Sequence, residues 1–242
     1  MNSEPLFQTP ENILDLHVSI SKGNIKLGSI PSFSTVPSDE ILCAADGRPL
    51  TDVVGTCKGV CGECKHDCYA VRMARGLFRS SCMPAWIKNT ILLRNYPQRV
   101  IDDITAFCVR KRSFQDVFRI NTSGEVENVG QWLMWFKIAE LCPKTRFYIY
   151  TKNTAVLSKA TEIAGGKIPE NLTVNVSQWN NTVDNPLCFQ EFVYDDGTDP
   201  EVAKLPHCPA VDKDGHETGI QCRQCQRCTR RCDGQKTAVY AH

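Results

Sequence analysis

Cysteine is the residue type in this sequence best suited to metal or redox chemistry, and its positions are strongly grouped. Eight of the 14 cysteines fall in two short runs. The first run is Cys57-x3-Cys61-x2-Cys64-x3-Cys68, and the second is Cys222-x2-Cys225-x2-Cys228-x3-Cys232, with Cys208-Pro209 upstream. Thiolates bind soft metals, and short spacings let one loop place several sulfurs around one centre. The two runs therefore predict two metal sites.

The spacing within the runs favours iron–sulfur clusters, with zinc as the alternative. Structural zinc usually takes two well-separated ligand pairs, whereas three or four cysteines crowd each run here. The second run has the C-x2-C-x2-C-x3-C spacing of bacterial ferredoxins, in which the fourth cysteine ligates a different cluster. Cys208 is therefore an alternative to Cys232 as the fourth ligand of the second site. The isolated cysteines are expected to be small buried hydrophobes: Cys43, Cys82, Cys108, Cys142 and Cys188.

The amino-acid composition excludes some classes of protein. With 42% hydrophobic residues and a net charge of +1, the chain is not expected to be disordered. Its length predicts one large domain, or one with a small appendage. Small disulfide scaffolds are shorter and dense in cysteine throughout, so that class is disfavoured.

The chain shows neither a secretory signal nor a membrane span. Residues 1–6 carry no basic start and no apolar stretch, and the longest apolar run is 132–136. A span needs about 18 apolar residues. We therefore expect a cytoplasmic protein with no membrane partner, in which thiols stay reduced and clustered cysteines indicate metal binding or catalysis.

Charge is unevenly distributed near the C-terminus. Residues 191–201 are acidic, and the tail is basic through Arg223, Arg227, Arg230, Arg231 and Lys236. A solvated surface explains both segments. Alternatively, the basic tail contacts nucleic acid or another acidic partner. The near-zero overall charge argues against a protein that coats nucleic acid.

The centre of the chain alternates strands with helices. Strands are predicted over 117–122, 146–151 and 172–177, and helical periodicity is found over 129–141 and 154–164. Further helices are expected over 85–96 and 98–109. Strand–helix–strand order implies right-handed crossovers and a parallel sheet, hence an α/β fold.

Each predicted strand ends in polar residues, namely Asn121-Thr122-Ser123, Thr151-Lys152-Asn153 and Ser177-Gln178. Ligands bind at the carboxyl ends of parallel strands, so these residues are candidates for a site, with ordinary loop chemistry as the alternative. We expect three regions: an irregular N-terminal arm (1–40), an α/β iron–sulfur core (41–190), and a Cys-rich C-terminal segment with the second cluster (191–242).

Two known families share these features, one of them distantly. The spacing of Cys57, Cys61 and Cys64 resembles that of the radical S-adenosylmethionine (radical SAM) enzymes, and Ser123-Gly124-Glu125 resembles the Gly-Gly-Glu motif that binds the cofactor's amino group. The resemblance implies a partial parallel (β/α) barrel with a 4Fe–4S cluster. It also implies cofactor-binding residues: Ser123, Gly124, Glu125, Thr151, Lys152, Asn153 and Ser177. Glu63 departs from the pattern, because those enzymes usually carry an aromatic residue before the third cysteine.

A closer resemblance, over residues 23–242, is to the phage family gene product 88. The shared motifs are Cys68-Tyr69-Ala70, Arg119-Ile120-x-x-Ser123-Gly124-Glu125, Phe147-Tyr148-x-Tyr150-Thr151, and Cys208-Pro209 followed by Cys222, Cys225 and Cys228. The resemblance implies a viral protein in the host cytoplasm. The resemblance implies a fold and a cofactor, but it does not indicate a particular reaction. The family's own spacing matches Cys57, Cys64 and Cys68, which leaves Cys61 as an extra thiol.

The number of iron ligands then decides the chemistry. Three thiolates on a 4Fe–4S cluster leave one iron open to SAM or another small molecule, whereas four close it. The first hypothesis is an enzyme with two clusters and radical-SAM-like chemistry on an unknown small or macromolecular substrate, supplied with electrons by a reductant protein. The alternative within enzymes uses the open iron without SAM. The hypothesis from another class is a non-catalytic iron–sulfur or zinc module that binds nucleic acid or a host protein.

Overall fold

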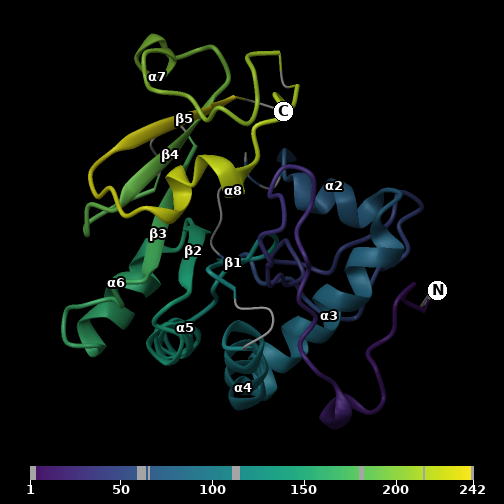
Figure 1. Cartoon of the computed structure of the whole chain (residues 1–242). Helices are drawn as coiled ribbons and strands as arrows, with labels where there is room; N and C mark the ends of the chain where they lie inside the picture. The colour runs from purple at the N-terminus through teal and green to yellow at the C-terminus, as the bar shows by residue number, and fades with distance from the viewer. Residues whose placement is uncertain are drawn as a thin grey trace.

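An open sheet of five parallel strands carries the fold (Figure 1). The strands are β1 (Val117–Ile120), β2 (Arg146–Thr151), β3 (Leu172–Gln178), β4 (Gln190–Asp195) and β5 (Lys236–Tyr240), and they lie in the sheet in sequence order. The structure is a computed structural model that describes residues 4–58, 64, 66–110, 115–179, 183–214 and 216–240. The predicted α/β fold and parallel sheet are confirmed.

Two helices make the crossovers predicted between the first three strands. The first is α5 (Val129–Leu141), whose N-terminus is capped by the Asn128 side chain accepting from the amide of Gln131. The second is α6 (Thr154–Ile163), which leads into β3. Both helices lie on one side of the sheet together with α4 (Pro97–Cys108), which corresponds to the predicted 98–109 helix (Figure 1).

The main core lies between these three helices and the sheet. The largest fully buried side chains there include Trp132 and Trp135 from α5, which meet Phe118 of β1 and Phe147 of β2 in one apolar cluster. The rings of Phe118 and Phe147 lie 5.7 Å apart. Burying each such side chain stabilises the fold by about 1.5–3 kcal/mol, so this layer is what holds the sheet rigid.

The opposite face of the sheet carries no long helix among the described residues and is covered by the C-terminal segment. There α8 (Cys222–Cys225) and the 3-10 turn η2 (Arg227–Thr229) cross in front of the strands (Figure 1). The side chain of Asn175 donates to the carbonyl of Cys228 at 3.2 Å, and Thr173 donates to the carbonyl of Thr229 at 3.3 Å. The second cysteine run is therefore fixed to the middle strand of the sheet.

The N-terminal arm lies along the free edge of β1. Residues 31–35 make parallel backbone contacts there, since Arg119 donates its amide to Pro31 and its carbonyl accepts from Phe33. The arm also contains a 3-10 turn, η1 (Ile13–Asp15). Covering an edge in this way satisfies backbone groups that would otherwise be free to pair with another chain.

The structure departs from the predicted elements in several places. The helix expected over 85–96 is α3 (Arg79–Asn95), which starts earlier because Met83 packs against the preceding helix, α2 (Tyr69–Arg75). The strands β4 and β5 and the short helix α7 (Pro200–Ala203) were not expected, because they lie in charged segments. Since β4 and β5 join the same sheet, the C-terminal segment is built into the core.

Within the described residues, no helix is both long and apolar enough to cross a membrane.

One buried ion pair ties α3 to the segment before the first cysteine run. Arg94 donates to both oxygens of Glu127 at 2.9 and 2.7 Å, and to the carbonyls of Val54 and Gly55 at 2.9 and 3.1 Å. The Glu127 side chain is only 4% exposed. Without Arg94, Glu127 keeps only the Gln131 side chain as a donor at 3.2 Å and the exposed Lys58 as a cation at 3.6 Å.

We expect Arg94→Ala to lower the free energy of unfolding by about 3 kcal/mol, because the buried carboxylate of Glu127 loses its directly hydrogen-bonded counter-charge and keeps only the exposed Lys58 at 3.6 Å. Urea denaturation measures this. The matched control is Arg48→Ala, which removes an exposed arginine 3.6 Å from Asp46 and should cost less than about 1 kcal/mol. Equal losses in the two variants would contradict the structural role of Arg94.

Candidate functional site

The second cysteine group lines one small cavity. Its sulfurs come from Cys208, Cys222, Cys225 and Cys228, and Phe192 of β4 and Gln226 complete part of the wall. The Cys222 amide donates to the carbonyl of Lys26 at 2.8 Å, which anchors the loop to the N-terminal arm. Four thiols from one loop and one upstream residue therefore converge, as four ligands of one metal centre must.

Burial disfavours the thiolate form of two of these cysteines, Cys228 and Cys222. The pKa of Cys228 is raised to about 12, mainly by burial and also by the neighbouring thiolates of Cys222 and Cys208, although a hydrogen bond from Tyr150 lowers it. The pKa of Cys222 is also raised, mainly by burial. A metal centre reverses this balance, because its positive charge stabilises thiolates. The donor set fits a thiolate-bound metal or cluster.

Cys232 lies apart from this group. Its amide donates to the side chain of Gln190 at 3.0 Å, and the cavity is lined by Cys208 instead. Of the two candidates for the fourth ligand, the structure brings Cys208 to the other three. Among the isolated cysteines, Cys108 and Cys142 are buried as expected, but Cys188 is exposed, so for that residue the expectation is wrong.

The first cysteine group lies at the carboxyl end of β1. Burial raises the pKa of Cys57, and the negative charges of Glu125, Cys68 and Cys64 raise it further. The Cys57 amide donates to the carbonyl of Ser38 at 2.8 Å, so the arm holds the start of this loop. Three thiols thus lie near one another and near a buried carboxylate. Cys61, the other predicted ligand of this run, lies outside the described residues.

The described residues contain one group of three potential metal ligands that lie within 4.8 Å of one another, formed by the side chains of Asp212, Asp214 and His216. No three of the described cysteine sulfurs are that close to one another.

Glu125, predicted to bind the cofactor's amino group, is committed to internal hydrogen bonds. One carboxylate oxygen accepts from the Val126 amide at 2.8 Å and from the Thr151 hydroxyl at 2.9 Å, and the other accepts from the Lys152 amide at 2.8 Å. Burial has the largest effect and raises its pKa, and these donors offset only part of that rise. Through these hydrogen bonds the Glu125 side chain joins the ends of β1 and β2.

The other residues predicted to bind the cofactor also make internal contacts. Ser123 donates to the carbonyl of Thr35 at 2.9 Å, and Asn153 donates to the carbonyl of Val126 at 3.2 Å. Lys152 reaches across to β3, where its ammonium group donates to Ser177 at 2.7 Å. These polar strand ends therefore meet at one edge of the sheet, as predicted, and brace it.

Asn121, directly after β1, is the exception at this edge. It is 3% exposed, and neither atom of its amide group has a hydrogen-bond partner among the described residues. Its backbone is left-handed, with φ of 51°. Buried amides are normally satisfied, so this one is suited to a bound molecule that offers both a donor and an acceptor. The sequence signal was its place at a strand end.

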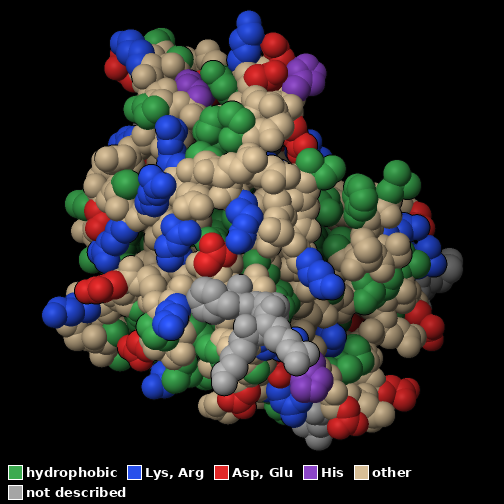
Figure 2. Space-filling model, viewed as in Figure 1, with side chains coloured by type: hydrophobic (Ala, Val, Ile, Leu, Met, Phe, Trp, Pro, Cys, Tyr) green, Lys and Arg blue, Asp and Glu red, His purple; other side chains and the backbone are tan. Residues whose placement is uncertain are grey.

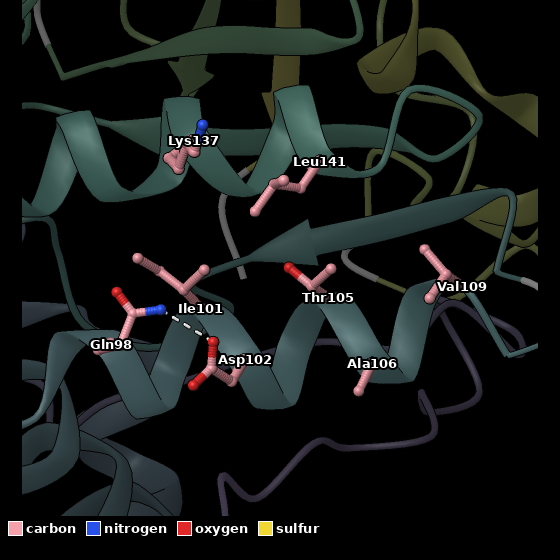
Figure 3. Close-up of a pocket in the computed structure, with 8 residues that line it drawn as sticks. All are labelled: Gln98, Ile101, Asp102, Thr105, Ala106, Val109, Lys137 and Leu141. Carbon is pink, nitrogen blue, oxygen red and sulfur yellow. Dashed lines mark hydrogen bonds between the residues drawn. The ribbon is translucent and has the colours of Figure 1, made fainter.

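The surface has two further features: a groove between α4 and α5, and a group of basic side chains near α8. Figure 3 shows a groove between α4 and α5 lined by Ile101, Thr105, Lys137 and Leu141, on the helical side of the sheet and without a cysteine.

Figure 2 shows Lys and Arg side chains over the α8 region. Three arginines of the predicted basic tail are engaged: Arg223 with Asp116, Arg227 with the carbonyl of His207, and Arg231 with Asp233.

Gly124 allows the close approach that positions the first cysteine loop. A Cβ at this residue would lie 1.9 Å from the Thr35 hydroxyl and 2.5 Å from that of Thr56, and its φ is +84°. Gly47 has nearly the same φ, +80°, but open space around it.

We expect Gly124→Ala to lower the free energy of unfolding by about 2–4 kcal/mol, since left-handed backbone costs about 1–2 kcal/mol and overpacking adds about 1–3 kcal/mol. Gly47→Ala should cost only the backbone part. Thermal unfolding of the two variants separates these contributions. Equal destabilisation would show that the contact with Thr35 and Thr56 is not tight.

Comparisons with known proteins agree with the closer of the two resemblances. No curated protein and no solved structure matches the chain, so the wider resemblance to radical SAM enzymes gains no support. The sequence model of the phage family described as gene product 88 matches residues 19–236, which include all the described cysteines of both groups. The chain therefore belongs to the gene product 88 family.

Proposed function

We propose that this protein is an iron–sulfur enzyme with two cluster sites, one held by three thiolates and the other by four. The first site uses Cys57, Cys64 and Cys68, and the second uses the four-cysteine group around Cys208. The observation that carries the proposal is the place of the first group, beside Glu125 at the carboxyl ends of β1 and β2, where parallel sheets bind ligands. The strand order, with helices on one side, fits a partial (β/α) barrel.

A three-thiolate cluster leaves one iron open, which offers a small molecule a Lewis-acidic and redox-active position. The chain's own residues would orient that molecule. Asn121 offers a buried amide that has no partner among the described residues. Glu125 and Lys152 hold the ends of β1 and β2 in place. SAM is the first candidate for the molecule. A different small molecule at the same iron is the alternative.

Iron and sulfide analysis after anaerobic reconstitution tests the two sites. We expect Cys57→Ser and Cys208→Ser each to remove about half of the iron and sulfide, because each loses a ligand of one cluster. Cys61→Ser and Cys232→Ser are the matched controls and should keep the full content. Stoichiometric zinc without sulfide would contradict the proposal. Loss of iron in Cys61→Ser would mean four thiolates and a closed first cluster.

Incubation of the dithionite-reduced protein with SAM tests the enzyme. We expect 5′-deoxyadenosine as a product, and at least a tenfold slower release in Asn121→Ala with unchanged iron content. Asn95→Ala removes an exposed asparagine at the end of α3 and should release the product at the wild-type rate. No product from an intact, reducible protein would favour open-iron chemistry without SAM.

A non-catalytic module remains the second candidate because basic side chains gather over the α8 region (Figure 2). Arg230 is exposed there, and counter-ion release would make any contact with nucleic acid strongly salt-dependent. Salt-dependent binding of nucleic acid by a protein that shows no turnover would favour this candidate. The engagement of Arg223, Arg227 and Arg231 within the chain makes us prefer the enzyme.

A further inference from the structure

The turn between α2 and α3, residues 76–79, exposes two large apolar side chains. Leu77 is 95% exposed and Phe78 is 62% exposed. Figure 2 shows hydrophobic side chains, with Lys and Arg side chains beside them, over the part of the molecule that holds α2 in Figure 1. Single exposed apolar side chains are ordinary, whereas adjacent ones rimmed by polar groups are typical of a contact surface for another molecule.

The surface around this turn is basic. Arg72 and Arg75 are exposed on neighbouring positions of α2, and Arg79 is exposed at the start of α3. Residues 68–101 contain no aspartate or glutamate. Among the described residues, none of these three arginines forms an ion pair. The turn therefore presents uncompensated positive charge to a molecule that approaches it.

The hairpin beside α2 does not neutralise this charge. The Arg75 guanidinium donates to the carbonyl of Cys43 at 3.0 Å, which fixes the hairpin against the helix. The hairpin's acid, Asp46, lies 3.6 Å from Arg48, so it already has a counter-charge of its own. A partner that matches this surface therefore carries carboxylates around an apolar contact area.

The same helix connects the turn to the first cysteine group. Cys68 is the N-cap residue of α2, which has seven residues and is therefore about 10 Å long. The inner face of α2 is buried at Ala70 and Ala74, which lie in one apolar cluster with Met83 of α3. A protein bound at the turn would thus lie about one short helix away from a thiol that we assign to the first cluster.

An electron carrier fits this surface better than a membrane or a nucleic acid does. Complexes between redox proteins bury little area, under about 1,200 Å², and charge steers their encounter. Two apolar side chains among three arginines suit such a small contact. Stable membrane binding needs more apolar area than two side chains supply, and a groove for single-stranded nucleic acid places several aromatic side chains among its cations.

We propose that the α2–α3 turn is the docking site of an acidic one-electron carrier protein that reduces the first cluster. Leu77 and Phe78 form the apolar contact, and Arg72, Arg75 and Arg79 attract the carrier's carboxylates. One electron passes from the carrier, which is oxidised, to the cluster, which is reduced, and no covalent bond forms or breaks. The inference rests on the proposed function and names the partner of its first site.

Stopped-flow absorbance of the anaerobically reconstituted protein tests the docking site, with reduced flavodoxin as the acidic carrier. We expect flavodoxin to reduce the double variant Leu77→Ser/Phe78→Ser about tenfold more slowly than the wild type, because the apolar centre of the contact is lost. Dithionite, a small ion that needs no docking surface, should reduce both proteins at the same rate. The matched control is Ile163→Ser, which truncates a side chain that is 59% exposed at the end of α6 and should keep both wild-type rates.

The dependence of the rate on salt tests the arginines. Added salt should slow the reduction of the wild type by flavodoxin, because screening weakens the attraction between the two proteins. The double variant Arg72→Gln/Arg79→Gln should be about tenfold slower at low salt and nearly insensitive to added salt. Lys159→Gln, which removes an exposed cation from α6, should behave as the wild type does.

Wild-type rates with flavodoxin in both double variants would overturn the docking site. Equal slowing with dithionite would place the effect within the cluster and would overturn it too. So would binding to phosphatidylserine vesicles or to single-stranded DNA that Leu77→Ser/Phe78→Ser abolishes while reduction by flavodoxin is unchanged. Full clusters that dithionite reduces, with no effect of the turn, would contradict the docking site alone, whereas zinc without sulfide would overturn the proposed function as well.

Discussion

The hydrogen-bonded junction at the end of β1 holds the first cysteine group in place. The Glu125 amide donates to the Thr56 hydroxyl at 2.9 Å, and the hydroxyls of Thr56 and Thr35 lie 2.9 Å apart. The Glu125 carboxylate accepts from β2 through Thr151 and Lys152. Four parts of the chain meet here: the N-terminal arm, the residue before Cys57, β1 and β2. The side chains at the centre of the junction, Thr35, Thr56 and Glu125, are all buried. Removing one of them therefore leaves buried polar atoms of the others without a hydrogen bond.

This junction explains how a loop is held firmly enough to serve as the metal site that we propose. Loops move more than the elements that they connect, yet a cluster needs its ligands at nearly constant distances. The start of the first loop is tied to the arm through Cys57 and Ser38, and its end to the sheet through Tyr69 and Thr122. The second loop is tied to the middle strand through Cys228 and Asn175. Both cysteine groups therefore use the same sheet as their rigid support.

The two groups use different parts of that sheet. The first lies at the carboxyl edge, beside polar strand ends and the amide of Asn121, which has no partner among the described residues. The second lies against the face that the helices leave uncovered, behind the tyrosines of β2. An edge site is open to small molecules, whereas a site between a sheet face and a covering loop is enclosed. This placement is the basis for the division of roles that we propose between an open and a closed cluster.

The sequence by itself determined the parallel strands at 117, 146 and 172, their crossover helices and the grouping of the cysteines, because hydrophobic periodicity and ligand spacing are local properties. Tertiary structure decided the rest. It placed β4 and β5 in the sheet despite their charges, since Glu191 pairs with Lys236 across those strands. It brought Cys208, rather than Cys232, to the second group and turned Glu125 inward. It also left the Asn121 amide without a partner within the part of the chain that the structure describes. Each of these outcomes depends on contacts between residues far apart in the chain, and no local pattern records which distant partner will satisfy a buried polar group.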